Sequence, residues 1–197
     1  MTWLVLGLVI FLGAHSVRIV AEGWRTATVA RLGANGWKGL YSLVSAVGLA
    51  LIVVGYGMAR TQPVLLWMPP VWMRHVAALL NLVAIVLIVA AYVPRNHFKV
   101  RLRHPMILGV KVWALAHLLS NQMLADVVLF GAFLAWAVFD YRAARARDRA
   151  AGAAGAAALP VPSLAASVVA LAVGVGAWAA IAFWAHGALF GVRPFGG

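Results

Sequence analysis

The chain has 197 residues, of which 65% are hydrophobic, and its mean hydropathy is +0.96. Soluble globular chains are about 45 to 50% apolar, so this composition excludes an ordinary soluble domain and indicates an integral membrane protein. The chain contains no cysteine, which excludes disulfides, thiolate ligands and haem attached covalently through a Cys-x-x-Cys-His motif.

Six apolar runs follow one another along the chain, and a helix needs about 20 such residues to cross a bilayer. The first run lacks the positive leading segment of a signal peptide, so we predict that it is retained. The fourth run is the shortest, because Lys111 and His117 interrupt it. We predict an all-α, polytopic bundle of about six transmembrane helices, at residues 2–20, 39–59, 73–93, 105–120, 122–141 and 163–190.

The positions of the basic residues explain the formal net charge of +12, which in a soluble chain would suggest nucleic-acid binding. If all six runs span, twelve of the sixteen lysines and arginines fall on one side of the membrane, and the positive-inside rule makes that side cytoplasmic. Both termini are then extracytoplasmic, and the predicted partner is the lipid bilayer, with no nucleic acid. The twelve are Arg18, Arg25, Arg31, Lys38, Arg95, Lys99, Arg101, Arg103, Arg142, Arg145, Arg147 and Arg149.

The last apolar run follows a stretch that is basic at first and then rich in alanine, glycine and proline. This composition is typical of a flexible linker. We predict a five-helix transmembrane core at 1–148, a linker at 149–162 and a C-terminal transmembrane helix at 163–197.

Four ionisable residues stand out inside the predicted spans, namely His15, Lys111, His117 and Asp126. Such residues cost about 2.5 to 3.5 kcal/mol to insert when they are Asp or Lys, and they tend to face a bundle interior or a cavity. A single histidine is explained equally well by helix packing and by ligation. Two in different spans favour a haem with His15 and His117 as axial ligands of the iron, and Asp126 is expected near the second ring nitrogen of His117.

Arg103 and His104 precede Pro105, and proline is favoured in a first helical turn. Because helix N-termini and basic side chains attract anions, the pair is either a site for phosphate, a carboxylate or a haem propionate, or an ordinary interfacial basic pair. Lys111 lies seven residues further along, about 10 Å deeper on nearly the same face. Its ammonium either snorkels back towards the interface or faces a ligand carboxylate.

Five segments in this order resemble the NnrU family of bacterial membrane proteins: "FLGAHSVR", "GWKGLYSLVSAVGLALIVVGYGMAR", "PVLLWMPPVWMRHVA", "LRHPMILGVKVWALAHLLSN" and "LFGAFLAWAVFDYR". The resemblance implies a bacterial inner (cytoplasmic) membrane and an association with nitrite and nitric oxide respiration, hence with denitrification. A relative of the family, the plant 15-cis-zeta-carotene isomerase, carries haem b, and its motifs match the axial pair to His15 and His117 and its "RHP" histidine to His104. Its further histidine has no counterpart in "FLAWAVFDYR", which puts isomerase chemistry in doubt while leaving haem binding open.

These observations predict a haem b protein with a redox or isomerase-like role, or a role in nitrite and nitric oxide respiration, acting on a small hydrophobic substrate or with a respiratory membrane partner. Its cofactor site comprises His15, His117, His104 and Arg103. Two alternatives stay open. "RHPMILG" is similar to a segment of isoprenylcysteine carboxyl methyltransferases, which implies an S-adenosylmethionine-dependent membrane methyltransferase using Arg103 and His104. The other is a non-enzymatic maturation partner of a respiratory complex.

Overall fold

The computed structural model describes residues 1–157 and 159–195. Within these residues, five helices are long and apolar enough to cross a membrane, and a sixth, Pro105–Ser120, is apolar but shorter. The prediction of an all-α transmembrane bundle is therefore confirmed. The chain divides into two compact units, one made of Met1–Met68 and Gln122–Asp140, the other of Pro69–Asn121 and Tyr141–Gly197.

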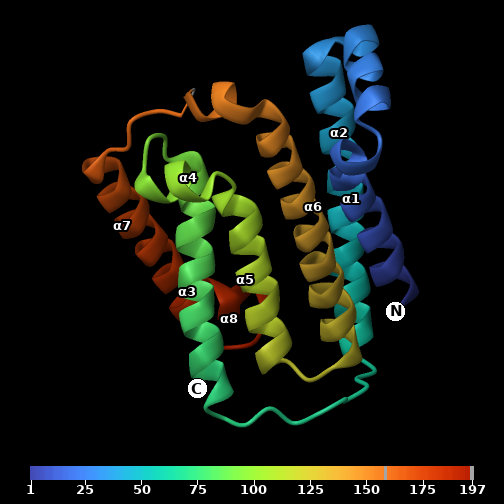
Figure 1. The fold of residues 1–197 in the computed structure, drawn as a ribbon. Helices are drawn as coiled ribbons and strands as arrows, with labels where there is room; N and C mark the ends of the chain where they lie inside the picture. Colours follow the sequence, from blue (N-terminus) through green and yellow to red (C-terminus); the bar gives the residue numbers. More distant parts are fainter. Residues whose placement is uncertain (158, 196–197) are drawn as a thin grey trace. The chain divides into compact units, whose positions relative to one another are not determined.

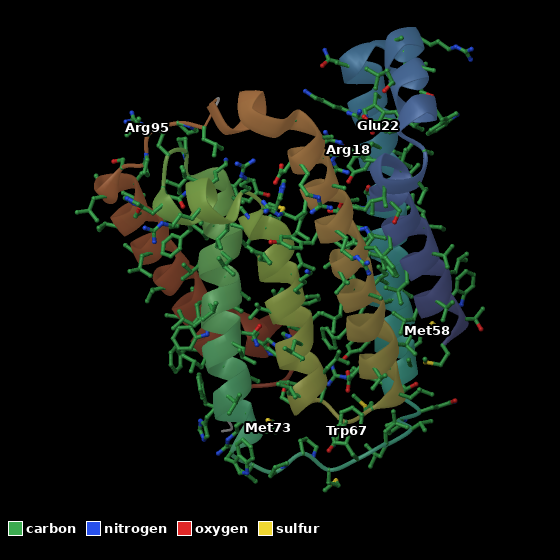
Figure 2. The ribbon with its side chains drawn as sticks, viewed as in Figure 1. Arg18, Glu22, Met58, Trp67, Met73 and Arg95 are labelled. Atoms are coloured by element: carbon green, nitrogen blue, oxygen red, sulfur yellow. The ribbon has the colours of Figure 1, made fainter. Side chains whose placement is uncertain are left out.

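The first unit begins with α1 (Thr2–Val20) and α2 (Glu22–Arg60), which run alongside each other (Figure 1). The predicted spans fall inside these two helices, but α2 starts well before its apolar run. Gly33 interrupts α2 with φ +73 and ψ 164, a conformation that glycine adopts readily because it has no Cβ. Arg18 and Glu22 flank the junction between the two helices (Figure 2) and pair at 3.9 Å.

Glycine lets the backbones of α1 and α2 approach closely. A Cβ added to Gly7 would lie 2.6 Å from the Ile52 nitrogen, and one added to Gly48 would lie 2.7 Å from the Phe11 nitrogen. Helices in lipid associate through such small-residue contacts, because lipid tails provide no hydrophobic force between them. The pairing of α1 with α2 therefore depends on glycine at these positions.

The first unit is completed by the apolar part of α6 (Leu124–Ala157). Two backbone hydrogen bonds of 2.8 Å, from Leu66 to the Gln122 carbonyl and from Leu124 to the Val64 carbonyl, fasten the chain after α2 to the start of α6. The helix then continues past the predicted span end at 141, with a break at Gly152 where φ is +54.

The second unit is built around α3 (Met73–Tyr92), which contacts both α5 (Pro105–Ser120) and α7 (Leu164–Ala180) (Figure 1). A Cβ added to Gly109 of α5 would lie 2.8 Å from the Ala84 carbonyl oxygen, and one added to Gly174 of α7 would lie 2.8 Å from the Val86 Cα. Its helices are α3 (Met73–Tyr92), α4 (His97–Leu102), α5 (Pro105–Ser120), α7 (Leu164–Ala180), the π-helical turn η1 (Ile181–Ala185) and α8 (His186–Phe190).

The last span is joined to α3 and α4 by side-chain hydrogen bonds as well. Trp178 donates from Nε1 to the Ala78 carbonyl at 3.1 Å, and His97 donates from its backbone nitrogen to the Ser167 hydroxyl at 3.0 Å. These contacts place α7 in the same compact unit as α3. The division of the chain at 148 and 162 drawn from the sequence stays a prediction.

Asn96 is fully buried at the start of α4. Its Oδ1 accepts from the Lys99 nitrogen at 2.8 Å and so caps α4, while Nδ2 donates to the Ala90 carbonyl at 2.8 Å and to the Val93 carbonyl. Because each polar atom of the amide is bonded, its burial carries no unpaired group. Asn96 thereby fixes the turn between α3 and α4.

Candidate functional site

His15 lies half-buried in the first unit among aromatic side chains of three helices. Its ring stacks on Phe11 with centroids 4.2 Å apart, and Tyr41 of α2 and Trp136 of α6 lie at 5.2 and 6.0 Å. Nδ1 donates to the Phe11 carbonyl at 2.7 Å. Since that bond puts the proton on Nδ1, the lone pair is on Nε2, the nitrogen that would bind a metal.

Trp136 supplies an unsatisfied donor beside His15. Its indole Nε1 is buried and has no hydrogen-bond partner among the described residues, although leaving a buried donor unpaired costs about 1 to 3 kcal/mol. Trp136 also meets the His15 ring at an interplanar angle of 89°. The surroundings of His15 thus combine aromatic rings packed around the imidazole with one buried donor that lacks a partner among the described residues.

His117 has a similar local arrangement in the second unit. Its Nδ1 donates to the Trp113 carbonyl, one turn earlier in α5, at 2.8 Å, and the Trp113 ring lies 5.2 Å away. The bond again leaves the lone pair on Nε2. The histidines predicted as an axial pair therefore lie in different units, and each is oriented by the carbonyl four residues before it.

No group of three or more His, Cys, Asp or Glu side chains that could hold a metal ion occurs among the residues that the structure describes. A structural zinc site needs about four such ligands, whereas haem iron needs only axial side chains. The residues around His15 fit a flat, apolar cofactor better than they fit a bare metal ion.

Three of the four remaining histidines, His75, His97 and His186, have their own contacts in the second unit. Nδ1 of His97 lies 2.8 Å from the Ser167 hydroxyl, Nδ1 of His186 donates to a backbone carbonyl at 2.6 Å, and the ring of His75 stacks on Phe195. These contacts explain the three histidines as parts of helix ends and packing.

Arg103 and His104 meet Asp148, on the charged extension of α6, within the second unit. Asp148 Oδ2 accepts from His104 Nε2 at 3.0 Å and from Arg145 at 3.1 Å, and the Arg103 guanidinium is 4.0 Å away. Asp148 lies 24 residues after Leu124, about 36 Å along the helix and beyond the hydrocarbon. Partial burial alone would raise the pKa of Asp148, but the hydrogen bond from His104 and the neighbouring cationic groups outweigh it and lower that pKa.

Lys111 and Asp126 both find partners inside their own units. The Lys111 ammonium lies 4.0 Å from the centroid of the Tyr141 ring, at the end of the apolar part of α6, which is the position expected for a snorkelling lysine. Asp126 accepts from the Tyr56 hydroxyl at 2.5 Å through Oδ1 and from the Met123 nitrogen at 3.0 Å through Oδ2. The second bond caps the start of α6, so Asp126 has a structural explanation.

Sequence reasoning missed Trp136, Tyr56 and Asp148. Trp136 and Tyr56 look like ordinary residues of apolar runs, and nothing in the local sequence marks them. Asp148 carried a usable signal, because it is the one acid in the basic stretch 142–149 and one of only four in the chain. A lone carboxylate among arginines is expected to be paired.

Apolar helices with many exposed large hydrophobic side chains define a multi-pass helical membrane protein, and the polar side chains described above lie within its units. A family model described as NnrU protein matches residues 3–194. The chain therefore belongs to the NnrU family, as its motifs predicted. Searches among curated proteins and among solved structures give no match.

Proposed function

We propose that this protein binds haem b, with His15 and His117 as axial ligands, and serves a redox role linked to nitrite and nitric oxide respiration in a bacterial inner membrane. The observation that carries the proposal is the surroundings of His15. There an imidazole with its Nδ1 proton fixed on the Phe11 carbonyl lies beside the unpartnered Nε1 of Trp136.

Each residue around His15 has a definite part in this proposal. The Phe11 carbonyl holds the imidazole in the tautomer that presents Nε2, as the outer partners of ligating histidines do. Phe11, Tyr41 and Trp136 provide flat apolar surface and exclude water, and the Trp136 N–H offers a hydrogen bond to an acceptor on the ligand. A bound haem b held by two histidines would supply one-electron chemistry.

His117 is supported by the same orientation, with Nδ1 on the Trp113 carbonyl and the Trp113 ring beside it. If both histidines ligate through Nε2, each imidazole keeps the hydrogen bond from Nδ1 to a carbonyl of its own helix. The haem proposal uses His15 and His117. It does not use Arg103 and His104, because both contact Asp148.

The membrane orientation belongs to the same proposal. In the first unit the basic residues gather where α1 ends and α2 begins. In the second they gather after the end of α3, in and beside α4, at the start of α5 and in the second half of α6. The positive-inside rule places these ends in the cytoplasm. Both chain ends are then extracytoplasmic.

Absorption spectra test the haem proposal. The protein is purified in mild detergent from a host with ample haem, and oxidised and dithionite-reduced spectra are recorded for the wild type, His15→Ala, His117→Ala and, as a matched control, His186→Ala. We expect a Soret band that each axial substitution removes or shifts and that the control leaves in place. Trp136→Phe keeps an aromatic ring, although a smaller one, and loses the N–H, and it is expected to shift the reduction potential.

The contrary results are equally definite. A folded wild type without a Soret band contradicts haem binding, and a band unchanged by His117→Ala contradicts the ligand assignment. Saturable binding of S-adenosylmethionine to a haem-free protein would favour the methyltransferase alternative. Copurification of a stable respiratory partner without a cofactor would favour the maturation alternative.

A further inference from the structure

Two guanidinium groups and an imidazole converge on a single carboxylate oxygen at one end of the second unit. His104 at 3.0 Å, Arg145 at 3.1 Å and Arg103 at 4.0 Å all approach Oδ2 of Asp148. We call these four residues the Asp148 cluster. Their side chains are 20 to 39% exposed, so solvent reaches the cluster but only partly screens it.

The Asp148 cluster has more positive charge than Asp148 can neutralise. Two guanidiniums and an imidazole face one carboxylate, and the chain as a whole has sixteen basic and four acidic residues. Basic residues concentrated in a partly enclosed place create a positive potential that raises the local concentration of anions. The charge of one carboxylate does not neutralise the cluster. The cluster can therefore attract a second anion, or an anion of higher charge in place of Asp148.

The backbone beside the cluster also favours an anion. The cluster lies at the start of α5, a helix of 16 residues, whose first-turn N–H groups and dipole attract negative charge. His104 occupies the N-cap position but makes no side-chain cap hydrogen bond, because its Nε2 donates to Asp148 instead. Arg103 has φ +62, a strained conformation for a residue with a Cβ, and such strain recurs at binding sites.

Asp148 is a poor geometric match for these donors. All three approach the same oxygen, whereas a phosphate group has several oxygens and a charge of up to about −2, so each donor could have its own acceptor. Arg145 precedes Asp148 by three residues in the same helix, so that pair is local. His104 and Arg103 link Asp148 to the start of α5.

We propose that Arg103, His104 and Arg145 form a binding site for a phosphate group, and that the Asp148 carboxylate is its intramolecular competitor. The ligand is either free phosphate or the phosphate of a lipid headgroup. Binding replaces Asp148 on His104 and Arg103 and so releases the extension of α6 from α5. The site does not depend on haem, and its test uses no haem signal.

If Asp148 competes with the phosphate, removing the charge of Asp148 should tighten phosphate binding. Full-length protein in a neutral detergent is titrated with inorganic phosphate by equilibrium dialysis, and with phosphatidic acid by native mass spectrometry. Asp148→Asn is expected to bind about fivefold more tightly than the wild type, since an exposed ion pair no longer competes. Arg103→Ala is expected to bind about tenfold more weakly, since a charge-assisted contact is lost.

Glu22→Gln is the matched control, because Glu22 also pairs with two arginines, Arg18 and Arg25, on an exposed surface of the other unit. It removes the same charge and is expected to leave phosphate binding unchanged. If Asp148→Asn binds inorganic phosphate more tightly and Arg103→Ala binds it more weakly, the ligand is a free anion. If these changes occur with phosphatidic acid alone, the ligand is a lipid headgroup.

The proposal is overturned if Asp148→Asn binds neither probe more tightly than the wild type does, or if Glu22→Gln tightens binding equally. Thermal unfolding by circular dichroism establishes that each variant is folded. If Asp148→Asn does not fold, Arg103→Ala decides alone, and unchanged binding in that variant overturns the proposal.

Discussion

Gly48→Ala tests the close packing of α1 against α2 at Phe11, whose ring stacks on His15. The added Cβ would lie 2.7 Å from the Phe11 nitrogen and 2.9 Å from its Cα, where an ordinary contact begins at 3.4 Å. Backbone atoms cannot rotate away as a side chain can, so α1 must move by about 0.7 Å, the difference between 3.4 and 2.7 Å. Overpacking of this kind costs about 1 to 3 kcal/mol.

Gly57→Ala is the matched control for this substitution. Gly57 lies in the same helix, and apart from its chain neighbours and the backbone of its own helix no atom is within 4 Å of the position of an added Cβ. Both substitutions gain the same helix-propensity benefit of about 1 kcal/mol, so the difference between them isolates the packing cost. We expect Gly48→Ala to be about 1 to 3 kcal/mol less stable than Gly57→Ala.

The free energy of unfolding is measured in mixed micelles by titration with a denaturing detergent, followed by circular dichroism. Because Phe11 both stacks on His15 and holds its Nδ1, the displacement should also change the environment of His15. Equal stability of the two variants would show that α1 and α2 are further apart than the distance of 2.7 Å between the added Cβ of Gly48 and the Phe11 nitrogen implies. That result would refute the packing argument.

Three further predictions concern the second unit. Asn96→Ala should destabilise the protein by about 2 to 3 kcal/mol in the same unfolding assay, because it leaves buried backbone groups unpaired. Trp178→Phe should cost about 1 kcal/mol through loss of the bond to Ala78 and speed proteolysis of the segment before α7. Since the pKa of Asp148 is lowered from 3.8 in the folded protein, its contribution should be complete above about pH 4 and fade as the pH falls further. A wild-type stability advantage over Asp148→Asn that persists unchanged at pH 3 would contradict that assignment.

The spans were predictable because membrane insertion depends on local hydrophobicity, which each stretch of sequence carries by itself. The predicted limits 2–20 and 105–120 coincide with α1 and α5. The start of α2 at Glu22 was not predicted, since residues 22–38 are polar enough to lie outside the hydrocarbon and gave no apolar run. Hydropathy says nothing of a helix that continues into water.

The site was predictable only in part. His15 and His117 stand out because an imidazole is costly in an apolar run. Their orienting carbonyls follow from helical spacing, since each acceptor lies four residues earlier. The contact of His104 with Asp148 spans 44 residues and depends on how α5 approaches the end of α6. No local pattern encodes an approach of that kind.

The bond from Trp178 to Ala78 joins residues 100 positions apart, and it bears on the order in which the protein is made. The helix that carries Ala78 enters the membrane long before the ribosome has produced its partner. Until then the surface of α3 that receives Gly174 and Trp178 is exposed to lipid or to insertion factors. The second unit can therefore reach its final packing only at the close of translation, and a nascent chain halted before residue 163 should remain sensitive to proteolysis in this region.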